Sequence, residues 1–516
     1  MLPIKTSLAL DQKNLHWLLL LLATLVACWA VFQEHGRIND DGVLYLEAAR
    51  VIALGEWKQS LDLYPWPLYP LLIAATHQLM GLSLQHAALL LSVLFFLLST
   101  HIFILLIKEV GGSSCTVIAG ALLLLSCSYI MRYVLPTVMR EQGHWAFYLA
   151  SLLYFLRFYR NSRWMDALGW QGCAIVAMLF RIEGITYLAL LPLMLITQQE
   201  LAWAERGKRL VKAYSLTILA IASVALALLL LPSLKLSDLG RLHEPMSVLQ
   251  GAYQQVTHGL IDKAHIIGDS VLGSFLSDYG MQGLILTLIA IIFGKITAAS
   301  GWLALILAVI YGKISALKLN NDARRLLIWV ASLGLLNLWV ILLCNFILPS
   351  RLAIPIAWII FIFGAFTLNS LYVKWQRSAP VLKRKLLWAA VIVLTLQLSI
   401  TLKPRPAHYN DEQDAVAWIN QNTAAASKVF YDNPRLRYYA GLPFVDRGIA
   451  DWDRVSKAID DGSIKSYNYL VIHMDNRRPE REKYLYQAVP QHLVATINSS
   501  KNRRILIFAL KDERPK

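Results

Sequence analysis

The sequence predicts a polytopic α-helical membrane protein that carries a small α/β domain at its C-terminus. Of the 516 residues, 57% are hydrophobic, and the mean hydropathy is +0.50, which is well above that of ordinary soluble domains. Apolar stretches that approach or reach the length of about 20 residues needed to cross a bilayer recur along most of the chain. The last part of the chain is polar instead. We therefore expect about 11–13 transmembrane helices, with interfacial helices in the first external loop.

The apolar stretches place the expected transmembrane helices. No small-residue cleavage site closes the first stretch, so we expect an uncleaved helix rather than a signal peptide. Gly283–Phe293 and Trp302–Tyr311 are short, and if both cross, the basic loop behind them lies on the wrong side. We therefore expect either that one of them does not cross or that the loop Ser233–Gly280 contains a re-entrant segment. The other expected spans are His16–Val31, Ala87–Ile107, Cys115–Ile130, Trp145–Phe158, Ala167–Phe180, Gly184–Ile196, Val211–Leu231, Leu326–Leu348, Leu352–Leu371 and Leu386–Leu402.

Positive charge is concentrated in the loops between these stretches. The net charge of +16 therefore indicates the positive-inside distribution rather than nucleic-acid binding, and we expect no nucleic-acid partner. The clusters expected to face the cytoplasm are Arg157–Arg163, Arg206–Lys212, Lys313–Arg325 and Lys374–Lys385. With the N-terminus inside, the first span carries the loop behind it to the outer face.

The chain changes character near Lys403. The runs "KVFYD", "YNYLVIH" and "RILIFAL" are rich in β-branched and aromatic residues and predict strands. The segment "DEQDAVAWINQN" predicts an amphipathic helix. We expect a transmembrane part over residues 1–402 and an extracytoplasmic α/β domain over residues 403–516, which is within the usual size range of a domain.

The first external loop carries adjacent acids, Asp40 and Asp41, at the start of an amphipathic segment. The apolar positions up to Leu54 predict a helix that lies along the membrane surface. "LYPWPLYPLLIAA" at Leu63–Ala75 predicts a second surface helix with interfacial aromatic residues. One acid suffices to stabilise a helix N-terminus, and that ordinary role is the alternative for the pair. Two ionised carboxylates at a lipid–water boundary suit a general base or a metal ligand.

Further charged residues stand at the entrances of expected spans. "VLPTVMREQGHWAFYL" places Arg140 and Glu141 there, "LFRIEGITYL" places Arg181 and Glu183, and "ILPSRLAIPI" places Arg351. Ionisable groups at membrane depth are costly and indicate a functional site. The alternatives are a structural Arg–Glu pair inside the bundle and, for the last arginine, a snorkelling end residue. Arginine side chains bind phosphate in a bidentate geometry, which suits a substrate that has a phosphate and a hydroxyl.

These motifs together resemble the GT-C glycosyltransferases that use polyprenyl-phosphate-linked sugars, the group that includes protein O-mannosyltransferases and lipid A aminoarabinose transferases. The matching features, in chain order, are "NDDGVLYLEAAR", "WPLYPLLIAA", "GLSLQHAALLLSVLF", the "RE" and "RIEG" elements, "PSRLAIPI" and "VFYDNPRLRYYAG". The similarity covers most of the chain, although each motif is short. The first acidic motif is Asp-Asp rather than the commoner Asp-Glu, which leaves open which aspartate is the base.

The resemblance implies an inverting sugar transfer on the extracytoplasmic face of a bacterial inner membrane. The donor is a polyprenyl-phosphate sugar, and the acceptor is a lipid, a glycan or a protein. Asp40 or Asp41 is the expected general base, and the donor phosphate is expected to bind Arg181, Arg351 and Arg140. Glu141 and Glu183 are candidates to stabilise the transition state or to hold a divalent cation, Mg²⁺ or Mn²⁺. Tyr45, Tyr69 and His243 are further candidate site residues.

Two other functions compete with this hypothesis. A transporter or flippase of lipid-linked sugars would be expected to have paired halves with helices broken at mid-membrane, and the sequence has no clear half-repeat. A receptor or scaffold needs far fewer spans. The sequence also contains no GxGxxG motif, P-loop, zinc signature or nucleophile elbow, so a nucleotide-sugar donor is disfavoured.

Overall fold

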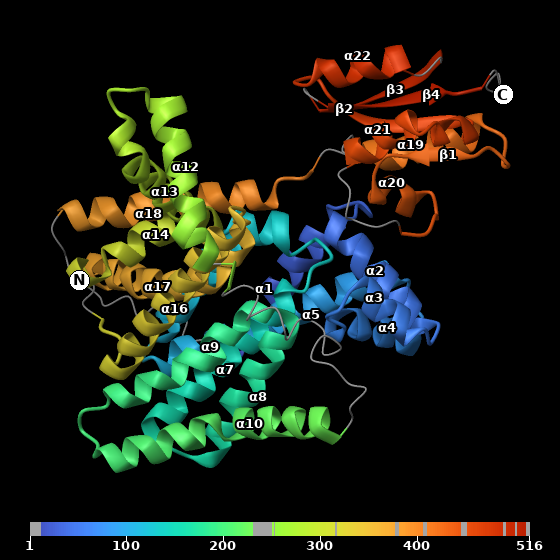
Figure 1. Cartoon of the computed structure of the whole chain (residues 1–516). Helices are drawn as coiled ribbons and strands as arrows, with labels where there is room; N and C mark the ends of the chain where they lie inside the picture. The colour runs from blue at the N-terminus through green and yellow to red at the C-terminus, as the bar shows by residue number, and fades with distance from the viewer. Residues whose placement is uncertain are drawn as a thin grey trace. The chain divides into compact units, whose positions relative to one another are not determined.

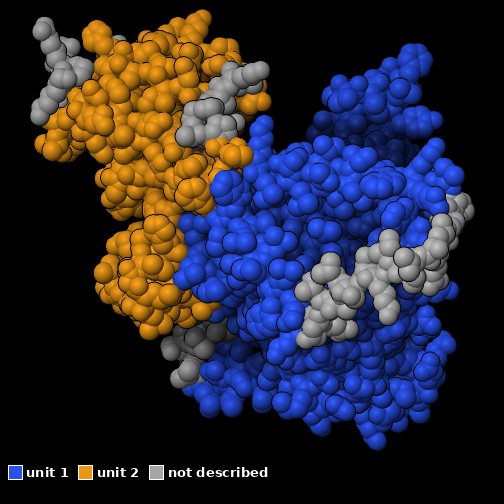
Figure 2. Space-filling model, turned by 180° about the vertical axis from the view of Figure 1, so that it is seen from behind, with its two compact units in different colours: residues 1–31, 65–69, 88–403 blue, residues 32–64, 70–87, 404–516 orange. Residues whose placement is uncertain are grey.

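The computed structural model describes residues 12–230, 250–251, 253–314, 317–376, 381–405, 410–444, 451–488, 492–500 and 503–511. The chain forms two compact units (Figure 2). Residues 1–31, 65–69 and 88–403 form the transmembrane unit. Residues 32–64, 70–87 and 404–516 form the second, which we call the loop–sheet unit.

Helices make up nearly all of the transmembrane unit (Figure 1). Among the described residues, seven helices are long and apolar enough to cross a membrane: α1, α5, α10, α13, α16, α17 and α18. The helices of this unit are α1 (Gln12–Phe32), α5 (Leu84–Glu109), α6 (Ser114–Ser126), α7 (Glu141–Asn161), α8 (Trp164–Phe180), α9 (Ile185–Leu190), α10 (Trp203–Leu230), α12 (Leu260–Ile266), α13 (Gly280–Ser300), α14 (Trp302–Val309), α15 (Tyr311–Ile314), α16 (Asn321–Asn345), α17 (Ile354–Gln376) and α18 (Val381–Leu402).

The polytopic helical class predicted from the sequence is confirmed. Among the described residues, the helices long enough to cross a membrane are fewer than the apolar stretches of the sequence. Several stretches form shorter or irregular helices. The stretch after Gly184 is divided into α9 and the 3₁₀ helix η3 (Leu191–Thr197). Of the two ambiguous stretches, the first lies in α13, whereas α14 has 8 residues, about 12 Å at 1.5 Å per residue, which is too short to cross a bilayer.

Helix α17 is the central helix of the transmembrane unit. It contacts α6, α13, α14, α16 and α18. In its most apolar stretch, 83% of the residues are buried. Its sequence is apolar on all sides, which is typical of a helix enclosed by other helices. The 3₁₀ turn η8 (Ser350–Ala353) leads into it and carries Arg351. Helices α7 and α8 pack against each other, so the start of α7 and the end of α8 can bring their charged residues together.

The loop–sheet unit contains a four-stranded sheet in the order β1-β2-β4-β3. β1 (Val429–Tyr431) is parallel to β2 (Tyr469–Asp475), while β4 (Arg503–Ala509) is antiparallel to both β2 and β3 (His492–Ser500). The three predicted strand runs are confirmed as β1, β2 and β4, and the predicted amphipathic helix is α19 (Asp411–Asn422). β3 was not predicted. It is an edge strand with two register shifts and partly exposed residues, so its alternation is weak.

Helices cover both faces of this sheet. Alternate residues of β2 and β4 point to opposite faces, as the strand period of two requires. Val471 and Ile507 pack with α19 and α20 (Pro434–Tyr439) on one face. Leu470 and Phe508 pack with α21 (Asp451–Asp460) and α22 (Pro479–Ala488) on the other. β2 is therefore enclosed between two helical layers.

Helices of the first loop belong to the same unit. They are α2 (Asp40–Ala53), α3 (Trp57–Leu63) and most of α4 (Leu68–Met80). α2 begins at the acidic pair, ends before Gly55, and contacts both α3 and α20. The two-part division expected from the sequence placed this loop with the transmembrane part, whereas its contacts group it with residues 404–516.

Candidate functional site

Four charged residues meet in the transmembrane unit, and we call them the Arg181 cluster: Glu141, Arg181, Glu183 and Arg351. Glu141 is the first residue of α7, and Arg181 follows the end of α8 in an extended conformation with φ −143° and ψ 120°. Glu183 lies in the 3₁₀ turn η2 (Ile182–Gly184). A Cβ on Gly184 would lie 2.9 Å from the Cα of Met178, so the turn can approach α8 only with glycine there.

The guanidinium of Arg181 holds both glutamates of the cluster. Its Nη2 donates to Glu183 Oε1 at 2.6 Å and its Nε to Glu183 Oε2 at 3.2 Å, a bidentate pair. Its Nη1 donates to Glu141 Oε1. Arg351 Nε lies 3.2 Å from the same oxygen. The side chains of Arg181 and Glu141 are only 9% and 3% exposed, so these are buried ion pairs, whose charges are strongly coupled.

A narrow cavity opens beside the cluster. Its walls include Glu141, Arg181, Glu183, Arg351 and parts of α16. Asn337 on α16 donates to the backbone oxygen of Glu183 at 2.9 Å, and this fixes the turn against α16. The second oxygen of Glu141, Oε2, is buried and has no hydrogen-bond partner among the described residues. A buried carboxylate oxygen without a donor is costly, so a donor from a ligand would be favourable there.

Arg140 adds a further cation beside the cluster. It occupies the N-cap position of α7 and is 8% exposed, and its charge acts on Glu183. The local set is thus three guanidinium groups and two carboxylates, Arg140, Arg181, Arg351, Glu141 and Glu183. The excess positive charge favours an anion.

The donor set also tests the expectation of a divalent cation at Glu141. Mg²⁺ and Mn²⁺ prefer several oxygen ligands. Within the part of the chain that the structure describes, no group of three or more His, Cys, Asp or Glu side chains is placed to hold a metal ion. Guanidinium groups surround Glu141 instead. These residues do not fit a cation, and no reaction step below depends on one.

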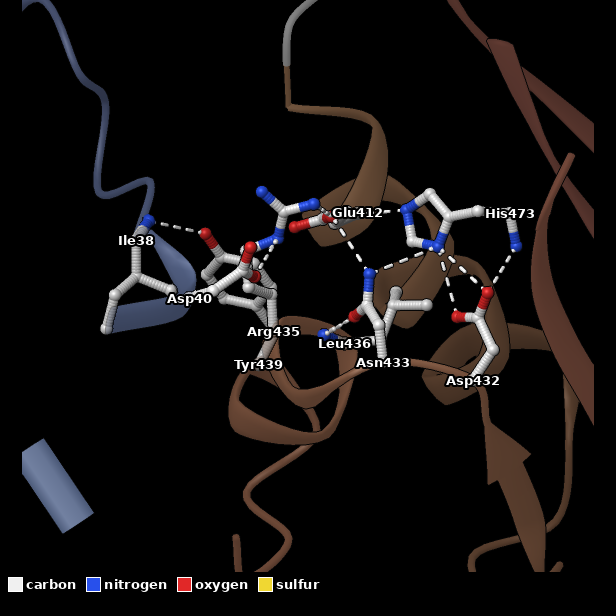
Figure 3. A network of polar contacts seen from close by, with 9 residues as sticks. All are labelled: Ile38, Asp40, Glu412, Asp432, Asn433, Arg435, Leu436, Tyr439 and His473. Carbon is white, nitrogen blue, oxygen red and sulfur yellow. Dashed lines mark hydrogen bonds and ion pairs between the residues drawn. The ribbon is translucent and has the colours of Figure 1, made fainter. Parts of the chain in front are cut away.

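Asp40 lies in the loop–sheet unit, in a network centred on Arg435 (Figure 3). Arg435 Nε is 3.3 Å from Asp40 Oδ1, and its Nη2 is 2.7 Å from Glu412 Oε1. Asn433 caps the short helix α20 by accepting from Leu436 N at 2.9 Å, and Pro434 follows at the first helical position. This Asn-Pro start is typical of a helix N-terminus, and it fixes the position of Arg435.

The network continues through His473 at the end of β2 (Figure 3). His473 Nε2 lies 3.1 Å from Glu412 Oε1, and Nδ1 lies 3.0 Å from Asp432 Oδ1. Burial opposes the charged imidazole, but Asp432 and Glu412 outweigh it and raise the pKa of His473 to about 10. Burial likewise opposes the charge on Glu412, but His473 and Arg435 lower the pKa of that carboxyl. The network is therefore an alternating series of charges, with Asp40 at its exposed end.

The other predicted site residues are placed as follows. Asp41 is half-buried in the first turn of α2. Tyr45 is buried on the same helix, and its ring centroid is 5.1 Å from that of Tyr64. Tyr69 is buried and is not among the residues that line the cavity at the Arg181 cluster. His243 lies outside the described residues. The structure thus joins the charged residues of the "RE", "RIEG" and "PSR" motifs, whereas Asp40 is joined to the "VFYDNPRLRYYAG" motif.

No protein-family model matches the chain, and no curated protein matches it in sequence. Solved structures do match. The archaeal oligosaccharyltransferase AglB from Archaeoglobus fulgidus, solved with an inhibitory peptide and a dolichol-phosphate, has a TM-score of 0.54 and 11% identity over 97% of this chain and 74% of that chain. The oligosaccharyltransferase of A. fulgidus in its apo form has a TM-score of 0.50 and 12% identity over 90% of this chain and 70% of that chain. The resemblance to GT-C glycosyltransferases is confirmed at the level of the fold.

Proposed function

We propose that this protein is an integral membrane glycosyltransferase that moves a sugar from a polyprenyl-phosphate-linked donor to an acceptor hydroxyl. The observation that carries the proposal is the Arg181 cluster together with the adjacent Arg140, in which three arginines outnumber two glutamates beside a cavity in a chain that has this fold. The neighbour solved with a dolichol-phosphate supports a donor of this chemical class.

The arginines supply what the departing phosphate requires. When the bond between the anomeric carbon and the phosphate oxygen breaks, negative charge grows on that oxygen. Guanidinium groups held in place beforehand stabilise this charge without reorganisation. In this proposal Arg351 and Arg140 contact the phosphate, while Arg181 is oriented by its bidentate pair with Glu183.

The unpartnered oxygen of Glu141 suits the sugar. A sugar hydroxyl can donate to Oε2, which is buried and has no other donor among the described residues. The negative charge of Glu141 also stabilises the oxocarbenium-like transition state of glycosyl transfer. Its Oε1 stays bound to Arg181 and Arg351, so the carboxylate is held in one orientation.

The acceptor side of the reaction requires a base. In our proposal, Asp40 or Asp41 removes the proton of the acceptor hydroxyl while the acceptor oxygen attacks the anomeric carbon from the face opposite the phosphate. The new carbon–oxygen bond forms, the bond to the phosphate breaks with its electron pair, and polyprenyl phosphate leaves. The aspartate keeps the proton, and the anomeric configuration inverts.

The proposal is tested with the full-length protein in nanodiscs. Polyprenyl-phosphate sugars of several kinds are offered beside nucleotide sugars, and the release of polyprenyl phosphate is measured. We expect release from at least one lipid-linked donor and from no nucleotide sugar. The anomeric configuration of the product then tests inversion. Binding of lipid-linked sugars with no release, in the presence of a broad set of acceptors, would favour a transporter and overturn the proposal.

The Arg351 side chain offers a sharper variant of this test. Arg351→Gln removes a phosphate contact but leaves both pairs of Arg181 in place, and we expect donor release to fall by at least about tenfold, the loss of one charge-assisted hydrogen bond. Arg324→Gln, on the exposed start of α16, is the control and should leave release unchanged.

A further inference from the structure

A second cavity lies within the loop–sheet unit and was not predicted from the sequence. Its charged and aromatic lining consists of four arginines, two aspartates, a histidine and a tryptophan: Arg435, Arg478, Arg481, Arg503, Asp432, Asp475, His473 and Trp452. Its empty volume is about 880 Å³, compared with about 390 Å³ for the cavity at the Arg181 cluster.

The fold places this cavity where α/β sheets commonly bind ligands. Asp432 and Asn433 directly follow β1, and His473 to Asp475 end β2, which is parallel to β1. Ligands of open α/β sheets bind outside the carboxyl ends of parallel strands. Arg503 begins β4 opposite Asp475 in the antiparallel register, so it reaches the same edge of the sheet.

Three of the cavity's arginines have no carboxylate bound to them. Among the described residues, no ion pair involves Arg478, Arg481 or Arg503. Asp475, one of the two acids that line the cavity, is bound by Arg477 through Nε to Oδ1 at 3.0 Å and Nη2 to Oδ2 at 2.8 Å, and the charge of Arg503 also acts on it. Arg481 is placed over the ring of Trp452, 4.9 Å from its centroid, which orients it by a cation–π contact. The lining thus holds four arginines against two aspartates, Asp432 and Asp475, and the cavity carries an excess of positive charge.

We propose that this cavity binds an anionic group, a carboxylate or a phosphate, on the saccharide acceptor of the reaction, through Arg478, Arg481 and Arg503. Arginine recognises both groups in a bidentate geometry. The assignment of this group to the acceptor rests on the proposed function, because the cavity alone defines only an anion site.

Arg435 connects the cavity to the proposed base. It lines the cavity and also pairs with Asp40 at 3.3 Å. An anionic group bound by the other arginines therefore lies in the same cavity as Arg435, which contacts Asp40. All of these residues belong to the loop–sheet unit. The acceptor hydroxyl near that group is then held close to the carboxylate that removes its proton, which is a positioning effect.

The test measures saccharide binding to the full-length protein in nanodiscs, with no donor present. The probes are trigalacturonate for the carboxylate, a phosphorylated maltotriose for the phosphate, and neutral maltotriose. We expect one or both anionic probes to bind at least about tenfold more tightly than the neutral one, and the binding to weaken as salt is raised. The double variant Arg478→Gln/Arg503→Gln should weaken anionic binding by at least about tenfold.

The matched control is Lys457→Gln/Lys465→Gln, which removes the same charge from exposed positions that do not line the cavity. Equal binding of neutral and anionic probes, or equal losses in both double variants, would overturn the inference. Failure of the proposed function is distinguishable, because donor cleavage is measured separately. Donor release without anion binding would refute only the cavity, whereas anion binding without any transfer would refute its role as an acceptor site.

Discussion

Arg435 and Asp40 form an ion pair across 395 positions of sequence, with Arg435 Nε 3.3 Å from Asp40 Oδ1. The pair joins the loop between α1 and α5 to the sheet domain within one compact unit. Because the side chain of Asp40 is 65% exposed, the pair contributes little to stability. Its consequence is orientation: the carboxylate at the start of α2 is directed by a residue whose own position Asn433 and Glu412 fix.

Arg435→Gln should therefore lower turnover without unfolding the protein. We expect kcat to fall by about tenfold, the scale of one charge-assisted contact, with the donor KM unchanged, because the residue orients the base and does not bind the donor. Arg435→Lys should restore part of the activity. Arg437→Gln is the control on the same helix, since the described hydrogen bonds of the Arg437 side chain go only to the backbone oxygen of Pro443. Equal losses in both variants would indicate a general effect on α20.

The stability of the loop–sheet unit should depend on pH through His473. Its pKa is raised from 6.5 to about 10 in the folded protein, so folding favours the protonated form. The stabilisation is fully present below about pH 6.5 and is lost as the pH rises through about 10. We expect the unfolding temperature to fall across this window, and His473→Gln to flatten the profile. His492→Gln, at an exposed position of β3, should retain the native slope, and a flat native profile would contradict the expectation.

The Arg181 cluster should be sensitive to loss of its cation. Arg181→Gln leaves Glu141 and Glu183 close together with fewer guanidinium partners, and breaking a buried pair costs about 3–5 kcal/mol. Unfolding in nanodiscs or detergent measures the change. Arg157→Gln is the matched control, because its pair with Glu109 is more exposed and should contribute less than about 1 kcal/mol. Similar losses of unfolding free energy in the two variants would show that the Arg181 pairs stabilise the protein no more than an exposed ion pair does.

Local sequence patterns predicted the elements that local rules govern. α2 begins at the acidic pair, α19 matches the amphipathic segment, and β1, β2 and β4 match the β-rich runs. The pairing of Arg181 with Glu183 follows from two residues in one turn. These features depend on helix ends, alternation and short spacing, all of which a single sequence contains.

The remaining features depend on contacts between distant segments. Glu141 and Arg181 form an ion pair although they are 40 positions apart in sequence. Asp40 contacts Arg435 because the first loop packs on α20. No periodicity encodes such pairs. A sequence signal did exist for the Arg435 network, because Asp432 and His473 are polar residues at the carboxyl ends of neighbouring parallel strands, where ligand sites commonly lie.

The central claim is that an aspartate at the start of α2 is the base of a sugar transfer from a lipid-linked donor. The most direct measurement is the rate of polyprenyl phosphate release by the full-length protein and by Asp40→Asn and Asp41→Asn, with Asp62→Asn on exposed α3 as the control. We expect one of the first two variants to lose about 10²–10⁴-fold in rate, the usual contribution of a general base, while the control keeps the native rate. Native rates in both Asp40→Asn and Asp41→Asn would contradict the account.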